Sequence, residues 1–123
     1  MIHLDTNFLI DALLPGSPQE AKLVSWQSGA EAMGFSSVAW GEFLCGPLSR
    51  VAESYARRIF PHAEPLERAD AEKAAELFNQ TGRRSKSYAD CCIAGIAIRA
   101  GAALASSNED DFSPMIPLGL ALA

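Results

Sequence analysis

The order of apolar runs and helical patterns predicts an α/β fold built on a mostly parallel sheet of about five strands. Short apolar runs occur at residues 2–4, 33–37 and 102–105, and a segment with helical spacing or a polar turn follows each one. Strands that alternate with helices imply a parallel sheet covered on both faces. The 123 residues are enough for one domain with a proper core and too few for two, so we predict a single domain over 1–123.

The first predicted strand, at 2–4, leads directly into Asp5, and apolar residues with helical spacing resume at Phe8. Asp is favoured at helix N-caps, so Asp5 has a simple interpretation as a cap. Its place suggests a second one, because ligands of open α/β sheets bind at the carboxyl ends of central strands. A carboxylate there is poorly solvated unless a cation, a donor or a proton compensates it. Both interpretations stay open at this point.

Start and stop signals mark the remaining elements. Ser17 is expected to cap a helix with Pro18 at its first position, and Ser36 or Ser37 is expected to cap the next helix. Asp70 is expected to cap a later helix. In chain order, the predicted helices lie at 18–28, 38–45, 48–60, 71–80 and 88–99, and the further strands at 33–37, 62–66, 102–105 and 116–122.

Composition restricts the function classes. An apolar span of about 18 residues is missing, as is the basic start of a signal peptide, so a cytoplasmic protein is expected. The three cysteines lack the spacing of a metal site and are expected to be reduced thiols. A net charge of −5 argues against a broad basic surface for nucleic acid, but not against an enzyme whose acids form a metal site.

Four acidic positions lie just beyond predicted strands or in the first turns of the helices that follow. They are Asp5, Glu42, Asp90 and Asp111. Each also has a structural interpretation: Asp90 is a favourable charge at a helix N-terminus, and the acidic turn 106–112 is a solvated loop. However, Asp90 lies on the apolar face of its helix, whereas a solvent-facing position would serve the helix dipole equally well.

Acids gathered at one edge of a sheet favour metal chemistry. Clustered carboxylates raise each other's pKa unless a cation lies among them. Hard oxygen ligands suit Mg²⁺ or Mn²⁺, and Mg²⁺ takes one or two carboxylates while it keeps waters and substrate phosphate as further ligands. Such an ion activates water and stabilises in-line displacement at phosphorus. The pattern therefore predicts metal-assisted phosphodiester hydrolysis.

Four segments carry these acids in order along the chain: 2–11 (IHLDTNFLID), 36–46 (SSVAWGEFLCG), 87–101 (SYADCCIAGIAIRAG) and 105–112 (ASSNEDDF). No single segment is decisive, but the ordered set is specific. Together they resemble PIN-domain proteins of the VapC type, the ribonuclease toxins of bacterial toxin–antitoxin pairs. The resemblance implies a three-layer αβα sandwich, a Mg²⁺- or Mn²⁺-dependent endoribonuclease, an RNA substrate and an inhibitory antitoxin as partner.

The resemblance also implies roles for individual residues. Asp5 and Asp90 hold the metal most directly, while Glu42 and Asp111 complete the shell or orient the water, with Asn108 as a further contributor. The supporting residues are Thr6, Asn7, Ser106 and Asn108. Ser106 stands where the family more often has threonine.

The helical phase of the acidic turn distinguishes its two neighbouring aspartates. If Asn108 caps a short helical turn, Asp111 at i+3 returns to the side of the cap, whereas Asp110 at i+2 points away. Asn108 and Asp111 are therefore expected to face the site, with Phe112 packed beneath. Glu109 and Asp110 are expected to face solvent.

Two surfaces are candidates for contacts with other molecules. Arg83, Arg84 and Lys86 form the densest basic cluster, which is either a solubilising loop or a contact with the RNA backbone. The resemblance implies a homodimer. A small domain cannot easily bury all of its large apolar residues, and exposed apolar patches usually mark interfaces. These residues are Trp40, Phe43, Leu44 and Phe60, although Trp40 is otherwise a core residue.

Two other function classes compete with the nuclease. A phosphotransfer or phosphatase domain also places an aspartate after a strand, but it needs a second nearby acid or a late lysine. Asp5-Thr6-Asn7 has no second acid, and none of the lysines follows a late strand. A non-catalytic PIN-like binding module is the stronger alternative, and metal titration distinguishes it from an enzyme.

Overall fold

A four-stranded parallel sheet lies at the centre of the computed structural model, which describes residues 1–81 and 88–123. The strands are β1 (Ile2–Leu4), β2 (Met33–Phe35), β3 (Ala103–Ala105) and β4 (Ala121–Leu122). They are ordered β2-β1-β3-β4, and all three pairings are parallel. The predicted α/β class with a parallel sheet is therefore confirmed.

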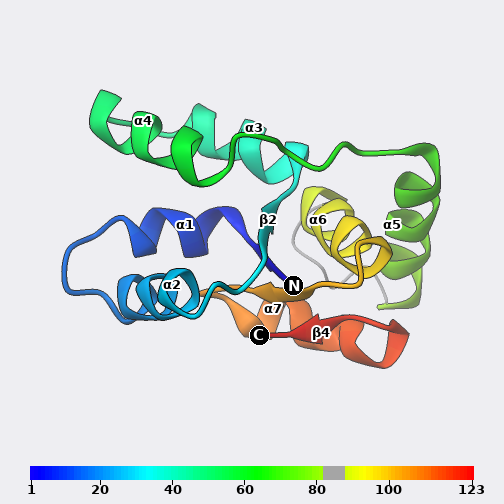
Figure 1. Ribbon diagram of the computed structural model, residues 1–123. Coiled ribbons are helices and arrows are strands. Elements are labelled where there is room, and N and C mark those ends of the chain that lie inside the picture. Colours follow the sequence, from blue (N-terminus) through cyan, green and yellow to red (C-terminus); the bar gives the residue numbers. More distant parts are fainter. Residues whose placement is uncertain (82–87) are drawn as a thin grey trace.

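Helices flank this sheet (Figure 1). They are α1 (Thr6–Ala12), α2 (Pro18–Ser28), α3 (Ser37–Cys45), α4 (Arg50–Ile59), α5 (Arg68–Gln80), α6 (Tyr88–Arg99), the short α7 (Glu109–Phe112) and a 3₁₀ helix, η1 (Ser113–Leu118). In Figure 1, α1 and α2 lie together on the left, and α5 and α6 pack together on the right. Gly95 permits the second pairing, since a Cβ there would lie 3.2 Å from the Asp70 carbonyl oxygen. None of the helices in the described parts of the chain has the length and apolar character needed to cross a membrane.

The predicted count of about five strands is wrong by one. Residues 62–66 do not form a strand: Glu64 makes only an isolated bridge to Ser36. Pro61 and Pro65 flank this bridge and lack the N–H groups that a longer ladder needs. The first three residues of the predicted strand 116–122 instead belong to the 3₁₀ helix η1, and β4 begins only at Ala121.

The helix starts follow side-chain caps. The Ser17 hydroxyl accepts a hydrogen bond from the Glu20 N–H at 3.0 Å, and Ser36, rather than Ser37, accepts one from the Ala39 N–H at 3.0 Å. The prediction for Asp70 is wrong, because α5 begins at Arg68 and Asp70 is its third residue. There the Asp70 carboxylate accepts a hydrogen bond from the N–H of Glu67 at 2.9 Å.

The core buries two of the aromatic residues that were expected at an interface. Phe43 and Phe60 are buried, and both lie against Phe35 with ring centroids 6.4 and 5.2 Å away. Trp40 is half-buried, and the Arg57 guanidinium lies over its ring at 5.2 Å. Leu44 alone of the four stays exposed. The set therefore does not form one surface patch, because α3 turns its aromatic side chains toward β2.

Candidate active site

The site lies where the strand order reverses. The chain leaves β1 toward β2 on one side and leaves β3 toward β4 on the other, so the carboxyl ends of β1 and β3 flank the crevice in which α/β proteins bind ligands. Asp5 directly follows β1, and Ser106 directly follows β3. The Ser106 hydroxyl donates a hydrogen bond to Asp5 Oδ2 at 3.1 Å, and both side chains are buried.

Asp5 has the first of the two roles that the sequence left open, and the second, ligand binding at the strand end, stays a prediction. It is the N-cap of α1, and its Oδ1 accepts a hydrogen bond from the Thr6 N–H at 2.8 Å. It is also an inward-facing acid, with only 4% of its surface exposed. Burial, supported by the charges of Asp90 and Glu42, raises the pKa of Asp5 to about 6 despite the hydrogen bonds from Ser106 and Thr6.

Two further acids reach this end of the sheet from helices on either side. The Thr6 hydroxyl donates to Glu42 Oε1 at 3.0 Å and lies 3.3 Å from the Ala39 carbonyl oxygen. This contact ties the first turn of α1 to α3. Asp90 is half-buried in the first turn of α6, near enough for its charge to act on Asp5. The structure therefore brings Glu42, which is exposed, and Asp90 near enough to Asp5 for their charges to act on its carboxylate.

The acidic turn has only part of the burial that its helical phase predicts: Phe112 is buried, but Asn108 is exposed and its side chain makes no capping hydrogen bond. Asn108 precedes α7, and its carbonyl accepts a hydrogen bond from the Asp111 N–H at 3.0 Å. Asp111 is half-buried, whereas Glu109 and Asp110 are exposed. The Asn108 N–H donates to the Ser106 hydroxyl at 2.9 Å, so Ser106 links the turn to Asp5.

An open polar pocket of about 530 Å³ extends from this turn toward α2. Gln19 and Lys22 line it on the α2 side. Ser107 also lines the pocket, and its hydroxyl donates to Asp11 Oδ2 at 2.6 Å. The sequence interpretation did not single out Gln19 and Lys22 for this region, because only the packing of α2 beside the acidic turn brings them there.

The donor set fits a hard divalent cation only in part. In the described portion of the chain, no three His, Cys, Asp or Glu side chains are grouped closely enough to hold a metal ion. The four carboxylates that were expected to converge therefore do not form a complete set of metal ligands in this structure. Mg²⁺ often takes only one or two carboxylates and keeps its waters, which suits Asp5 with one neighbour. A cation would also compensate the buried Asp5 carboxylate, whose pKa its surroundings raise.

The remaining residues that the sequence predicted for the site are not found beside Asp5 in the described part of the chain. Asn7 is exposed on α1, directly after Thr6. Arg83, Arg84 and Lys86 lie outside the described residues.

A family model of the PIN domain matches residues 2–115 of the chain. The chain belongs to the PIN-domain family. The matched region begins with β1 and extends into η1, so it includes Asp5, Glu42, Asp90 and Asp111. No curated protein sequence matches the chain significantly.

Solved structures show the same fold as this PIN domain. VapBC2 from Rickettsia felis bound to a promoter DNA fragment has a TM-score of 0.78 and 17% identity, covering 100% of this chain and 98% of that one. FitAcB from Neisseria gonorrhoeae has a TM-score of 0.70 and 19% identity, covering 99% and 96%. A toxin–antitoxin complex from Klebsiella pneumoniae has a TM-score of 0.67 and 23% identity, covering 92% and 91%.

Proposed function

We propose that this PIN domain is a metal-dependent endoribonuclease and the toxin of a toxin–antitoxin pair. The observation that carries the proposal is the buried carboxylate of Asp5 at the β1–β3 crevice, with the charges of Asp90 and Glu42 beside it. Nuclease activity is typical of PIN domains, and the similar solved structures include toxin–antitoxin complexes. Expression of the chain is expected to arrest growth, and co-expression of a small DNA-binding protein encoded beside it is expected to relieve the arrest.

Each acid has a proposed role in hydrolysis of the RNA phosphodiester bond. Asp5 and Asp90 would hold Mg²⁺ or Mn²⁺, and Glu42 and Asp111, with Asn108, would complete its surroundings or orient the attacking water. The ion, when bound, stabilises charge on the phosphate and makes water a better nucleophile.

The neighbouring hydroxyls and amides hold these acids in place. The Thr6 N–H and the Ser106 hydroxyl each bond one oxygen of Asp5, which fixes the plane of its carboxylate. The Thr6 hydroxyl donates to Glu42 Oε1 and so fixes one oxygen of that carboxylate beside the start of α1. Preset orientation of this kind lowers the cost of arranging the reacting groups.

The two aspartates of the acidic turn provide a paired test. Asp111→Asn is expected to lower metal-dependent cleavage by more than about tenfold, because charge near the metal is lost. Asp110→Asn removes the same charge from an exposed neighbour and is expected to stay within a few-fold of the parent. Initial rates of RNA cleavage in Mn²⁺ measure both. An inactive Asp110 variant beside an active Asp111 variant would contradict the assignment of Asp111.

A non-catalytic binding module is a second candidate, favoured by the lack of a closed three-ligand metal group in the described residues. Titration with Mn²⁺ separates the two. A nuclease is expected to show metal-dependent RNA cleavage and a higher melting temperature in Mn²⁺. A binding module is expected to show neither.

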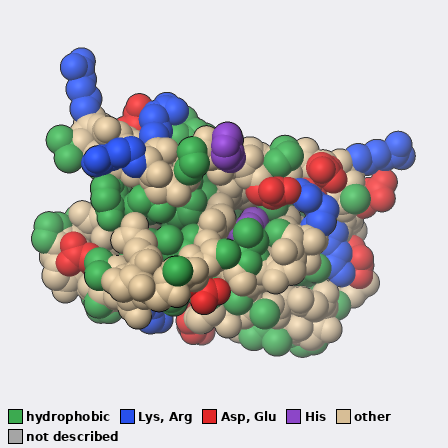
Figure 2. All heavy atoms as spheres, in the orientation of Figure 1, with side chains coloured by type: hydrophobic (Ala, Val, Ile, Leu, Met, Phe, Trp, Pro, Cys, Tyr) green, Lys and Arg blue, Asp and Glu red, His purple; other side chains and the backbone are tan. Residues whose placement is uncertain are grey.

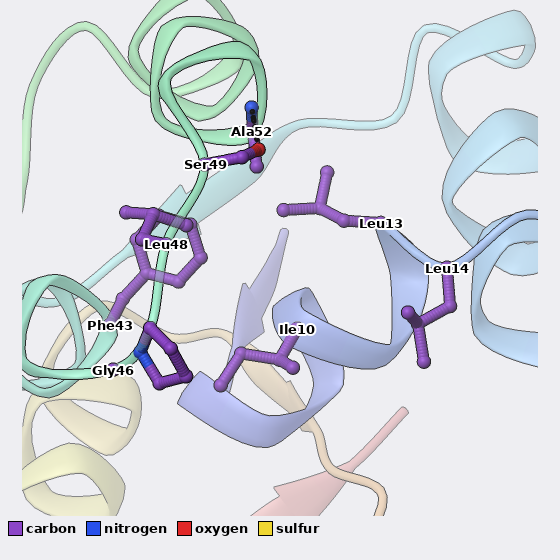
Figure 3. Close-up of a pocket in the computed structure, with 9 residues that line it drawn as sticks. Ile10, Leu13, Leu14, Phe43, Gly46, Leu48, Ser49 and Ala52 are labelled. Atoms are coloured by element: carbon purple, nitrogen blue, oxygen red, sulfur yellow. Dashed lines mark hydrogen bonds between the residues drawn. The ribbon is translucent and has the colours of Figure 1, made fainter.

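The antitoxin is proposed to bind an apolar groove between α1 and α4 (Figure 3). Two adjoining cavities of about 320 Å³ each share Leu13, Ser49 and Ala52. In Figure 3, Ile10 of α1 and Leu13, which follows that helix, face Leu48 and Ala52 across the first cavity. A surface lined by apolar side chains along two helices suits the apolar face of an amphipathic helix from the partner.

Exposed apolar residues and arginines border this groove. Leu14, Val24 and Val51 are 55%, 51% and 81% exposed, so a partner would remove them from water. Lys and Arg side chains gather over α4 at the upper left of Figure 2, above the recess. Arg50, Arg57 and Arg58 belong to α4, and this charge favours acidic residues beside the apolar face of the partner.

Leu14→Glu is expected to weaken antitoxin binding by at least about tenfold, because it places a charge in the apolar interface. Leu14 is exposed in the free protein, so the variant should fold normally. Leu66→Glu is the matched control, since Leu66 is 42% exposed but lies outside the groove. Calorimetry with the co-encoded protein measures both affinities. Equal weakening by the two variants would argue against this groove.

We also propose that the protein forms a homodimer. Phe43 and Phe60 are buried in the core, so Leu44 and Trp40 are the apolar residues of the predicted set that can still contribute to a dimer interface. Light scattering at tens of micromolar is expected to give twice the monomer mass. A monomer mass at that concentration would refute it.

A further inference from the structure

The polar pocket beside the acidic turn has two chemically different sides. Lys22 and Gln19 are three residues apart on α2, so they share one face of that helix and supply an ammonium group and an amide. Glu109 on the opposite side supplies carboxylate oxygens, which accept hydrogen bonds, and the carboxylates of Asp110 and Asp111 add negative charge beside it. The pocket is thus basic on one side and acidic on the other.

The pocket adjoins the catalytic crevice directly. Ser106 lines the pocket and also donates its hydrogen bond to Asp5 Oδ2. A ligand in the pocket therefore lies next to whatever occupies the β1–β3 crevice. Lys22 is in none of the ion pairs found among the described residues, so its charge is available to a ligand.

We propose that this pocket binds the nucleotide next to the scissile phosphodiester, with Lys22 as a phosphate contact and Glu109 as a contact to the base or ribose. This inference rests on the proposed ribonuclease function. A nucleotide in a single strand carries an anion on one edge, and N–H and O–H donors on its base and its 2′-hydroxyl. Lysine pairs with the phosphate as a point charge, while carboxylates accept from base amino groups and from the 2′-hydroxyl.

The pocket suits a nucleotide better than a bare anion. Three carboxylates on one side would repel free phosphate, and Lys22 with Gln19 on the other side would disfavour a wholly cationic ligand. The volume of about 530 Å³ lies within the usual range of small-ligand sites. A nucleotide satisfies both sides when its phosphate lies toward α2 and its base toward the acidic turn.

The first test measures RNA binding without cleavage. In an Asp5→Asn background, Lys22→Gln is expected to weaken binding of a labelled single-stranded RNA several-fold and to reduce the salt slope of log K by about 0.7. Lys73→Gln is the matched control, because Lys73 lies on α5, outside the pocket, and pairs with Glu76. Fluorescence anisotropy over a salt series gives both quantities. Equal affinities and slopes for the two variants would overturn the role of Lys22.

The second test concerns base preference in the active enzyme. Glu109→Gln is expected to change the relative cleavage rates at different bases, because it replaces a pure acceptor with a group that also donates. Glu72→Gln, on the exposed surface of α5, is expected to leave the pattern of cleavage sites unchanged. An unaltered pattern in Glu109→Gln would overturn the base or ribose contact.

The two tests separate this inference from the function on which it rests. If RNA binds through Lys22 but the parent chain never cuts it, the proposed nucleotide pocket is supported and the proposed nuclease activity is refuted. If the parent chain cuts RNA and Lys22→Gln has no effect on RNA binding, the proposed nucleotide pocket is refuted and the proposed nuclease activity is supported.

Discussion

Asp5→Asn is expected to abolish metal-dependent RNA cleavage, by more than about 100-fold, and to leave the fold intact. The amide removes the charge that the metal needs. Its oxygen can still accept from the Thr6 N–H, and its amide group can donate to Ser106. Cleavage of single-stranded RNA in Mg²⁺ and Mn²⁺ measures the loss, and circular dichroism checks the fold. Near-parent activity would exclude Asp5 from catalysis.

The same variant is expected to be more stable than the metal-free parent at neutral pH. The folded pKa of Asp5, about 6, lies above its unfolded value of 3.8, so ionisation above pH 6 costs the folded state up to about 3 kcal/mol. Parental stability should therefore fall as the pH rises through this window, whereas the asparagine variant lacks this loss. Thermal melts in EDTA should show an advantage of the variant at pH 8 that disappears near pH 3.8. A lower melting temperature at pH 8 would contradict this.

Loss of Arg99 is expected to be the most damaging change outside the site. The Arg99 Nε donates to Asp70 Oδ1 at 2.8 Å, and its other nitrogens bond Glu64 Oε1 at 2.8 Å and the Pro65 carbonyl at 3.0 Å. Asp70 is only 2% exposed. Burial alone would raise the pKa of Asp70, but the hydrogen bonds from Arg99 and the Glu67 N–H outweigh it and lower the pKa.

Arg99→Leu would leave this buried carboxylate without its cation and is expected to cost about 3–5 kcal/mol in the free energy of unfolding. The lowered pKa means that Asp70 stabilises the parent above its unfolded pKa of 3.8 and loses this effect as the pH falls through its folded pKa. Urea unfolding at pH 7 measures the cost. Arg68→Leu is the control, because its pair with Glu72 is exposed and worth below about 1 kcal/mol. Asp70→Asn in the Arg99→Leu background should recover part of the loss.

The sequence was sufficient to predict the central part of the fold and where the candidate residues lie in it. The alternation of strand and helix, and an acid at the end of the first strand, are local patterns that the structure reproduces. The predicted places of Ser106, directly after a strand, and of Asp111, in a short helical turn, also agree with the structure, because their spacing follows from one strand and one helical turn. The functional roles of these residues remain predictions.

What the sequence did not reveal depends on contacts between distant segments. Asp70 resembled a cap because its pairing with Arg99, 29 positions away, leaves no local pattern. Phe43 and Phe60 appeared surplus because their burial depends on how α3 and α4 fold back over β2. Lys22 was not a candidate from the sequence, because it lines the polar pocket only through the packing of α2 beside the acidic turn.

The bond between Asp5 and Ser106 has a consequence during protein synthesis. Its partners are 101 positions apart, and the strand that carries Ser106 can pair with β1 only after all the helices between them have been made. A nascent chain therefore carries Asp5 without its Ser106 partner until the segment with β3 has been made, so this end of the sheet forms late in synthesis.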